Sequence, residues 1–433
     1  MKNGSTLADL WTANRRRLRE LMQPRALAVV NANDVLPTNA DGTLRMEPGS
    51  DLYYLTGVEQ EETVLLMFPD ADDEKDREIL FLREQTPRIA TWEGPKLTPE
   101  EARRRTGIRT VLGLGEFPAQ FHRLMCECEA VYLNANEHKR AVVAVETRDA
   151  RFVAECQRRY PLHRYERLAR LMHRLRSVKS PAEINLIRQA CSITGHGFRR
   201  ALRRVKPGVC EAEIEAEFAC EFIRRRGRFA YTPIIAAGRN ACALHYIANN
   251  AACRKGDLLL MDVAARFSNY NSDLTRTVPV SGRFTRRQRQ VYEAVLRVFR
   301  QCVEGLRPGK RWKEWQKEAE QMIEGELVGL GRLSRSEVRR QDPDRPAFKK
   351  YFMHGVGHPI GLDVHDVGFL TEPFQAGWVM TVEPGIYLPE EGFGIRLENT
   401  VVIGERGNED LMAGIPIEAD EIEALMGAGG RAG

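Results

Sequence analysis

The sequence contains no apolar run as long as the roughly 18 residues that a membrane-spanning helix requires. Its 65 Lys and Arg residues are nearly balanced by 60 Asp and Glu residues, so the net charge of +5 is spread over a large surface. Such a charge lacks the basic stripe that is typical of proteins that bind nucleic acid. We therefore expect neither a membrane nor a nucleic acid as a partner of this chain.

The nine cysteines include no C-x-x-C pair. Residues 1–20 carry charged and polar side chains where a secretory signal peptide needs an apolar stretch. Reduced, mostly buried thiols are typical of a reducing compartment. These features predict a cytoplasmic location.

Two common catalytic motifs are also missing. The sequence has no glycine-rich phosphate loop of the Walker kind and no serine in a nucleophile-elbow sequence. Neither kind of chemistry is therefore indicated.

Length and pattern predict two domains. A chain of 433 residues exceeds what one hydrophobic core usually organises. Apolar spacing predicts a helix over 6–22 and strands at 26–33, 51–58, 62–69, 77–84 and 130–136. Ser180, Pro181 and Glu183 then form the start signal of a long helix. We expect an N-terminal α/β domain over 1–175 and a second domain over 176–433.

The second domain mixes helices and strands, so the chain as a whole is predicted to be α+β. Helices are expected over 181–205, 211–226, 285–306 and 312–331. Two buried strands are expected at 257–264 and 273–280, joined by a polar turn, and further strands between 354 and 403. Strands so close in sequence should pair.

Asp262 is an acid within an apolar strand, where an ionised carboxylate costs several kcal/mol unless a cation or hydrogen bonds compensate it. Taken alone, it is more simply explained as a carboxylate that caps a turn or pairs with Arg276. Asp273 favours a different explanation, because strand pairing can point both carboxylates at one spot. Two like charges there call for a cation.

Histidines and further acids extend this set. Three of the nine histidines, His354, His358 and His365, lie close together among glycines. Glu383 and Glu398 each follow an apolar strand segment. A single histidine is more often a core residue, and a single glutamate is more often a surface group or an arginine partner. Clustered with carboxylates, however, imidazoles are ordinary metal ligands.

The candidate metal ligands are four carboxylates and one imidazole, namely Asp262, Asp273, His358, Glu383 and Glu398. Hard oxygen donors suit Mn²⁺, Mg²⁺ or Co²⁺ better than a thiolate-bound zinc. Four negative charges match two divalent ions, so a dinuclear centre is expected.

The same residues carry a resemblance to a known family. The chain resembles the Xaa-Pro aminopeptidases (aminopeptidase P) of the pita-bread superfamily, which also holds creatinase, prolidase and methionine aminopeptidase. The resemblance extends over nearly the whole length, with residues 49–57 in the N-terminal half. In the C-terminal half it runs through the motifs Leu244-His245-Tyr246, Met261-Asp262, Asp273-Leu274-Thr275-Arg276-Thr277, His354 to His365, Val382-Glu383-Pro384-Gly385 and Ile395-Arg396-Leu397-Glu398.

This resemblance implies a fold, a cofactor and a reaction. It implies a creatinase-like N-terminal domain, a C-terminal pita-bread metallopeptidase domain and two metal ions, expected to be Mn²⁺. It further implies attack of a metal-bridging hydroxide on the carbonyl before proline, which releases the N-terminal residue of peptides that begin Xaa-Pro.

The resemblance also implies a role for each site residue. Asp273 and Glu398 would bridge the two ions, Asp262 would complete one ion, and His358 with Glu383 would complete the other. His245, His365 and Glu383 match catalytic positions. The substrate-binding positions are matched by His245, His354, His365, Tyr387 and Arg396.

The chain departs from the family pattern at three places. After Asp262 the chain has Val263-Ala264, where the family commonly has the smaller pair Ala-Gly. The segment between Glu383 and Glu398 is short, and residues 366–378 contain no arginine. Many relatives, including dipeptide-specific prolidases, place basic residues in this last stretch. The absence of arginine from residues 366–378 argues against a dipeptidase, because the carboxylate of a dipeptide substrate needs a cationic partner.

Two alternatives to an Xaa-Pro aminopeptidase remain. One is an Xaa-Pro dipeptidase, and the other is a non-catalytic binding protein on the same fold. Relatives are often dimers or tetramers, so a homo-oligomer is expected. Trp92, in a loop of the N-terminal domain, is either local packing or a cover for the active site of a neighbouring subunit.

Overall fold

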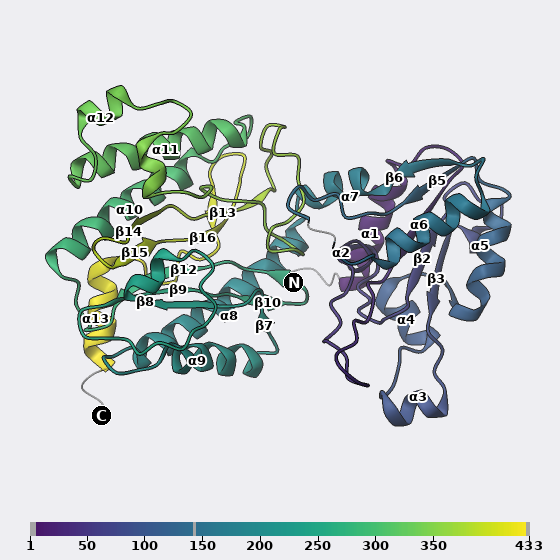
Figure 1. Cartoon of the computed structure of the whole chain (residues 1–433). Helices are drawn as coiled ribbons and strands as arrows, with labels where there is room; N and C mark the ends of the chain where they lie inside the picture. The colour runs from purple at the N-terminus through teal and green to yellow at the C-terminus, as the bar shows by residue number, and fades with distance from the viewer. Residues whose placement is uncertain (1–5, 142–143, 430–433) are drawn as a thin grey trace. The chain divides into compact units, whose positions relative to one another are not determined.

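The structure is a computed structural model that describes residues 6–141 and 144–429 (Figure 1). The chain divides into two compact units, Met1–Arg176 and Ser177–Gly433. Among the helices described, none combines the length and the apolar character that crossing a membrane requires.

Unit 1 is built on one mixed sheet with the strand order β4-β3-β2-β1-β5-β6. Strand β1 runs antiparallel to β2 and parallel to β5. The strands are β1 (Ala26–Asn31), β2 (Val64–Met67), β3 (Glu78–Leu82), β4 (Thr110–Gly113), β5 (Ala130–Leu133) and β6 (Arg164–Arg167). The helices are α1 (Leu7–Arg19), α2 (Ser50–Thr56), α3 (Pro87–Trp92), α4 (Pro99–Thr106), α5 (Phe117–Met125), α6 (Arg148–Arg159) and α7 (Leu168–Ser177).

Alternate residues of the central strands supply the core of unit 1. Because side chains alternate between the two faces of a strand, Leu27 and Val29 of β1 point to the same side. They belong to a buried cluster with Phe121 of α5 and Cys156 of α6. The predicted strands at 26–33, 62–69, 77–84 and 130–136 are therefore confirmed, each somewhat shorter than expected.

The strand predicted at 51–58 is wrong, because Ser50–Thr56 is helix α2. Its aromatic and branched side chains favour a strand by local propensity. Tertiary packing decides otherwise, since Leu52, Tyr53 and Tyr54 are all buried and the Tyr53 ring meets Trp11 of α1 edge-on at 5.2 Å. Gly57 ends the helix with φ 66°, a left-handed conformation that glycine adopts without steric cost.

Unit 2 surrounds several short sheets with helices. Helices α8 (Pro181–Arg204) and α9 (Glu211–Arg224) lie on one side of the strands, and α10 (Arg286–Gly305) and α11 (Trp312–Gly329) on the other (Figure 1). The start predicted for α8 is confirmed: the Ser180 hydroxyl accepts the Glu183 N–H, and the Glu183 carboxylate accepts the Ser180 N–H. Helices α12 (Arg335–Arg340) and α13 (Ala419–Gly429) complete the set described.

The sheets of unit 2 have the orders β12-β9-β8, β11-β10-β7, β13-β16-β17 and β14-β15. Their strands are β7 (Arg228–Phe229), β8 (Ile234–Ala237), β9 (Leu258–Asp262), β10 (Ala265–Phe267), β11 (Tyr270–Asn271), β12 (Thr275–Pro279), β13 (Val379–Val382), β14 (Gly385–Leu388), β15 (Phe393–Arg396), β16 (Asn399–Val402) and β17 (Glu409–Asp410). The expected pairing of the two buried strands is confirmed, since β9 and β12 are antiparallel with Asp262 opposite Thr275.

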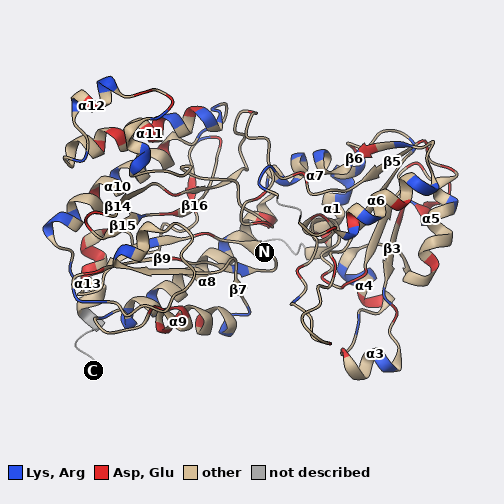
Figure 2. Cartoon of the chain, viewed as in Figure 1, with Lys and Arg blue, Asp and Glu red and all other residues tan. Residues whose placement is uncertain are grey.

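Basic and acidic residues both occur on the helices of each unit (Figure 2). Ion pairs join many of them, for example Arg200 with Glu217 and, at 2.7 Å, Arg297 Nη2 with Glu326 Oε2. Basic charge on these helices is thus balanced by acidic charge over short distances.

We expect Gly57→Ala to lower the free energy of unfolding by about 2–4 kcal/mol, of which the left-handed backbone accounts for about 1–2 kcal/mol. The remainder is steric, because a Cβ atom at Gly57 would lie 2.2 Å from Trp11 Nε1. Gly94→Ala is the matched control: Gly94 has φ 83° and no heavy atom within 4 Å of such a Cβ. Urea unfolding of both variants measures the difference, and equal losses would contradict the steric account.

Candidate metal centre

Asp262 and Asp273 reach the site from neighbouring strands. Asp262 is the last residue of β9, and Asp273 precedes β12 by two positions. The Tyr231 hydroxyl oxygen lies 2.6 Å from Asp262 Oδ1 and 2.6 Å from Asp273 Oδ1. A hydroxyl carries one proton and can donate to only one carboxylate at a time. Tyr231 therefore holds the two acids together without neutralising both.

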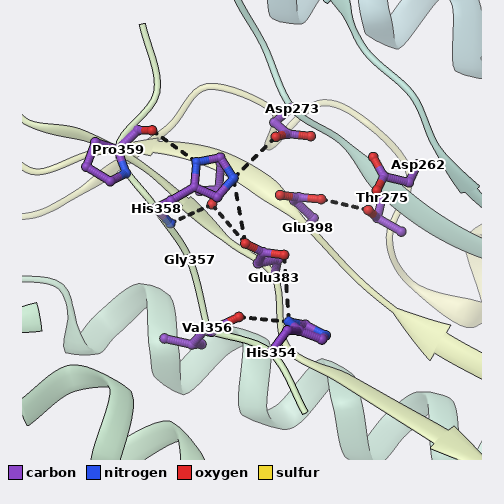
Figure 3. Close-up of polar contacts among 12 residues, drawn as sticks. Asp262, Asp273, Thr275, His354, Val356, Gly357, His358, Pro359, Glu383 and Glu398 are labelled. Carbon is purple, nitrogen blue, oxygen red and sulfur yellow. Dashed lines mark hydrogen bonds and ion pairs between the residues drawn. The ribbon is translucent and has the colours of Figure 1, made fainter. Parts of the chain in front are cut away.

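His358 and Glu383 come from two segments that run side by side. The His358 N–H donates to Thr381 Oγ1 at 3.0 Å, and the Thr381 N–H donates to the His358 carbonyl at 2.8 Å. The Glu383 N–H donates to the Val356 carbonyl at 2.8 Å. Strand β13 thereby fixes the histidine segment and brings Glu383 beside His358 (Figure 3).

Glu398 is set by β12. Its N–H donates to the Thr275 carbonyl at 3.0 Å, and the Thr275 hydroxyl donates to Glu398 Oε2 at 2.6 Å. Behind it, Arg276 Nη1 donates to the Glu398 carbonyl at 2.8 Å, and Arg276 itself is fully buried. Backbone and side-chain contacts together leave Glu398 facing Asp273 and His358 (Figure 3).

The separations between these groups fit a shared cation. Single donor atoms of Asp273, His358 and Glu398 all lie within 4.8 Å of one another. His358 Nε2 is 3.6 Å from Asp273 Oδ2 and 3.7 Å from Glu383 Oε1, both too long for a hydrogen bond. Ligand atoms about 2.1 Å from one divalent ion lie roughly 3–4 Å from each other. The residues present therefore fit a metal ion.

The electrostatics of the site lead to the same conclusion. Burial and the charge of Asp262 raise the pKa of Asp273 well above its usual range. Burial, together with the charges of Asp273 and Glu383, raises the pKa of Glu398 in the same direction. Like charges close together in a buried site cannot all ionise unless a cation is bound. A divalent cation would reverse both shifts.

The His358 ring is oriented by its own neighbour. Its Nδ1 lies 3.0 Å from the Pro359 carbonyl oxygen, which can only accept, so Nδ1 carries the proton. The unprotonated Nε2 then faces the carboxylates. A metal-ligating histidine ordinarily donates its other ring N–H in this way.

Three of the expected substrate residues form one polar chain. Arg396 Nη1 donates to Tyr387 Oη at 2.7 Å, and Tyr387 Oη donates to His354 Nε2 at 2.8 Å. His354 Nδ1 donates to the Gly355 carbonyl at 2.8 Å. Burial lowers the pKa of His354 to about 3, with a further contribution from the Arg396 guanidinium. His354 is therefore a neutral imidazole with its protonation pattern fixed.

The arginine partner of Asp262 is Arg396, at 2.6 Å from Nη2 to Oδ2. The sequence alone also allows Arg276 as the partner of Asp262. Arg276 instead donates to the Pro416 carbonyl and to Asn399 Oδ1, both at 2.8 Å. The alternative of an Asp262–Arg276 pair is therefore wrong, because strand alternation turns the Arg276 side chain to the other face of β12.

His365 and His245 are more exposed. The ring centroid of His365 lies 3.9 Å from that of His358. His245 follows the short helix Gly238–Cys242. The next residue, Tyr246, donates its hydroxyl proton to the buried Glu211 carboxylate at 2.7 Å. Glu211 thus anchors the segment that carries His245.

Two residues of the site, Tyr231 and Thr275, were not predicted from the sequence. Tyr231 contacts two candidate ligands, and Thr275 contacts a third. Thr275 lies two residues after Asp273, so strand alternation alone could have placed it on the same face. Tyr231 lies outside the motifs that carry the candidate ligands, and nothing in its local sequence distinguishes it from a core tyrosine.

Comparisons with known proteins identify the family of the chain. The sequence model of metallopeptidase family M24 matches residues 185–405, and that of the aminopeptidase P N-terminal domain matches residues 11–132. The chain is 34% identical to the Xaa-Pro aminopeptidase of Escherichia coli K12, covering 95% of this chain and 96% of that protein. It is 30% identical to human Xaa-Pro aminopeptidase 3, covering 96% and 85%.

A solved structure is similar over nearly the full length. The structure of E. coli aminopeptidase P with the inhibitor Pro-Leu has a TM-score of 0.87 at 33% identity, covering 98% of this chain and 99% of that chain. The similarity includes both units of the fold.

We expect Gly357→Ala to weaken divalent-metal binding by about tenfold or more, since supporting positions typically contribute 10–100-fold to affinity. A Cβ at Gly357 would lie 2.1 Å from the Thr381 carbonyl oxygen and 2.9 Å from the Trp315 ring, so the adjacent His358 must shift. Calorimetric titration with Mn²⁺ measures the affinity.

Gly355→Ala is the matched control in the same segment, because its nearest neighbour, the Trp312 ring, is at an ordinary 3.4 Å. Its affinity should stay within about twofold of the wild type. Two variants that bind metal equally well would contradict the role given to close packing at Gly357.

Proposed function

The chain belongs to metallopeptidase family M24, and from that premise we propose that it is a metal-dependent Xaa-Pro aminopeptidase. It releases the N-terminal residue from peptides with proline in the second position. One observation carries the proposal: buried carboxylates and the His358 Nε2 atom face one another at separations too long for hydrogen bonds but suited to a shared cation. A non-catalytic binding protein has no need of such a cluster.

The expected ligand roles are kept as part of the proposal. Asp273 and Glu398 would lie between two ions, Asp262 would complete one, and His358 with Glu383 would complete the other. The contacts that hold each carboxylate, described above, support this set. The bound ions would supply an activated water and would polarise the carbonyl that precedes proline.

Side chains of this chain are proposed to transfer a proton and to stabilise charge. Hydrolysis forms a carbon–oxygen bond at that carbonyl, breaks its bond to the proline nitrogen, and moves one proton from the attacking water to that nitrogen. Glu383, near His358 and His354, is the group proposed to carry this proton. His365 and His245, exposed beside the site, are proposed to stabilise the charge that develops on the carbonyl oxygen.

Proline explains why a dedicated enzyme is needed. Its nitrogen has no N–H and its ring fixes φ, so a peptidase that reads an extended backbone by hydrogen bonds fits it poorly. His354, Tyr387 and Arg396 are proposed to shape the substrate site, since their polar chain is rigid and ends beside Asp262.

We propose Mn²⁺ as the metal, because four of the five candidate ligands are carboxylates, and hard oxygen donors favour such ions. The nine cysteines are free thiols, which supports a cytoplasmic location. We further propose a homo-oligomer, a dimer or tetramer. Trp92 supports it, because this large apolar side chain on α3 is 82% exposed in the single chain.

The competing function is that of an Xaa-Pro dipeptidase. In its substrate the proline is the C-terminal residue, and the proline carboxylate needs a cationic partner. Arg396 is unsuited to this task, since its Nη1, Nη2 and Nε atoms already contact Tyr387, Asp262 and Thr275. Residues 366–378 offer no arginine. Both observations favour longer peptides.

We expect a tetrapeptide of the form Xaa-Pro-Yaa-Zaa to be cleaved with a kcat/KM at least equal to that of the matching Xaa-Pro dipeptide. The reason is that the dipeptide would have to bury its carboxylate without a partner. Both substrates are assayed after Mn²⁺ reconstitution. A preference for the dipeptide of about tenfold, equivalent to about 1.4 kcal/mol, would make the protein a dipeptidase. No cleavage of either would contradict the enzyme assignment.

A further inference from the structure

A buried ion pair lies behind the histidine segment. Lys179 Nζ is 3.1 Å from Asp366 Oδ2, and the two side chains are only 2% and 1% exposed. Neither residue is a candidate metal ligand or substrate residue. Removing two charges from water is costly, and an apolar pair of similar volume is often as stable. Stability alone is therefore a poor explanation for this pair.

Asp366 closes a short loop onto His358. The Asp366 backbone N–H donates to the Pro359 carbonyl at 2.9 Å, and that oxygen also accepts the His358 Nδ1–H at 3.0 Å. The contact that orients the His358 ring thus shares its acceptor with Asp366. Asp366 also follows His365 directly, whose ring lies 3.9 Å from the His358 ring.

The loop packs closely against the ion pair at Gly361. A Cβ at Gly361 would lie 2.2 Å from Asp366 Oδ2 and 2.9 Å from Lys179 Cε, so the loop backbone lies directly against the ion pair. In addition, Asn271 Nδ2 donates to the Gly361 carbonyl at 3.1 Å and to the Leu362 carbonyl at 2.9 Å. The ion pair therefore contacts the loop at Gly361 and includes Asp366, its last residue.

The backbone of Lys179 is held in place by its neighbours. Its backbone N–H donates to the Gly377 carbonyl at 2.9 Å. The next residue, Ser180, is the N-cap of the long helix α8. The ion pair therefore ties the loop at 359–366 to the start of a helix.

We propose that Lys179 and Asp366 are positioning residues for the two imidazoles, fixing the loop so that His358 faces the metal and His365 lies on the His358 ring. This inference rests on the proposed roles of these histidines. A purely structural pair would affect stability without a specific effect on metal binding or on His365.

The double variant Lys179→Met, Asp366→Asn tests the proposal, because it removes both charges together and leaves neither one buried alone. The introduced asparagine keeps a side-chain oxygen for the Val367 N–H, which donates to Asp366 Oδ1 at 2.9 Å in the wild type. We expect kcat and Mn²⁺ affinity each to fall about 10–100-fold, with KM changed less than about threefold. Calorimetry on the metal-free protein and urea unfolding accompany the kinetics.

The control is Lys310→Met, Glu318→Gln, which removes a 2.6 Å ion pair of the same unit in which the lysine side chain is 7% exposed. It should leave kcat, KM and metal affinity unchanged. A cycle with His365→Ala makes the test specific: in the double-variant background, this substitution should change kcat by less than about twofold, because the positioning of His365 is already lost.

The proposal is overturned if the double variant keeps wild-type kcat and Mn²⁺ affinity. It is also overturned if adding His365→Ala to the double variant lowers kcat by the same factor as it does in the wild type. Failure of the enzyme assignment is distinguishable. In that case the wild type would be inactive on Xaa-Pro peptides, while metal affinity and unfolding would still measure the ion pair.

Discussion

Repulsion among buried carboxylates sets the requirement that the other contacts of unit 2 have to meet. Asp273 and Glu398 are only 5% and 2% exposed, and burial and neighbouring negative charge raise the pKa of both. Without a cation, such acids would protonate or move apart. The surrounding structure prevents the second outcome, so the cluster is preorganised for positive charge.

The groups that hold the carboxylates in place belong to several elements. Tyr231, Thr275 and Arg396 contact the carboxylates directly, while Arg276 fixes the backbone of Glu398 from behind. Strands β9, β12 and β13 supply the rigid frame that a catalytic site needs, because strand positions are more precise than loop positions. The least regular element, the loop at 359–366, is closed by hydrogen bonds and the Lys179–Asp366 pair.

The sequence predicted those parts of the site that break a local rule. Asp262 was recognisable because an acid ends an apolar strand, and the histidines because three lie close together among glycines. Residues that follow ordinary rules were not recognisable: Tyr231 reads as a core tyrosine, and the choice of Arg396 over Arg276 depends on tertiary geometry. Helix α2 was mistaken for a strand for a related reason: its residues favour a strand by local propensity, and the packing of their side chains against α1 decides the structure instead.

The proposed function depends on a dinuclear centre formed by the five residues Asp262, Asp273, His358, Glu383 and Glu398. Anomalous diffraction from crystals equilibrated with Mn²⁺ gives the clearest test of this centre. We expect two anomalous peaks per chain, with Asp273 and Glu398 contacting both ions. A single peak, or peaks that leave Asp273 or Glu398 uncoordinated, would contradict the assignment.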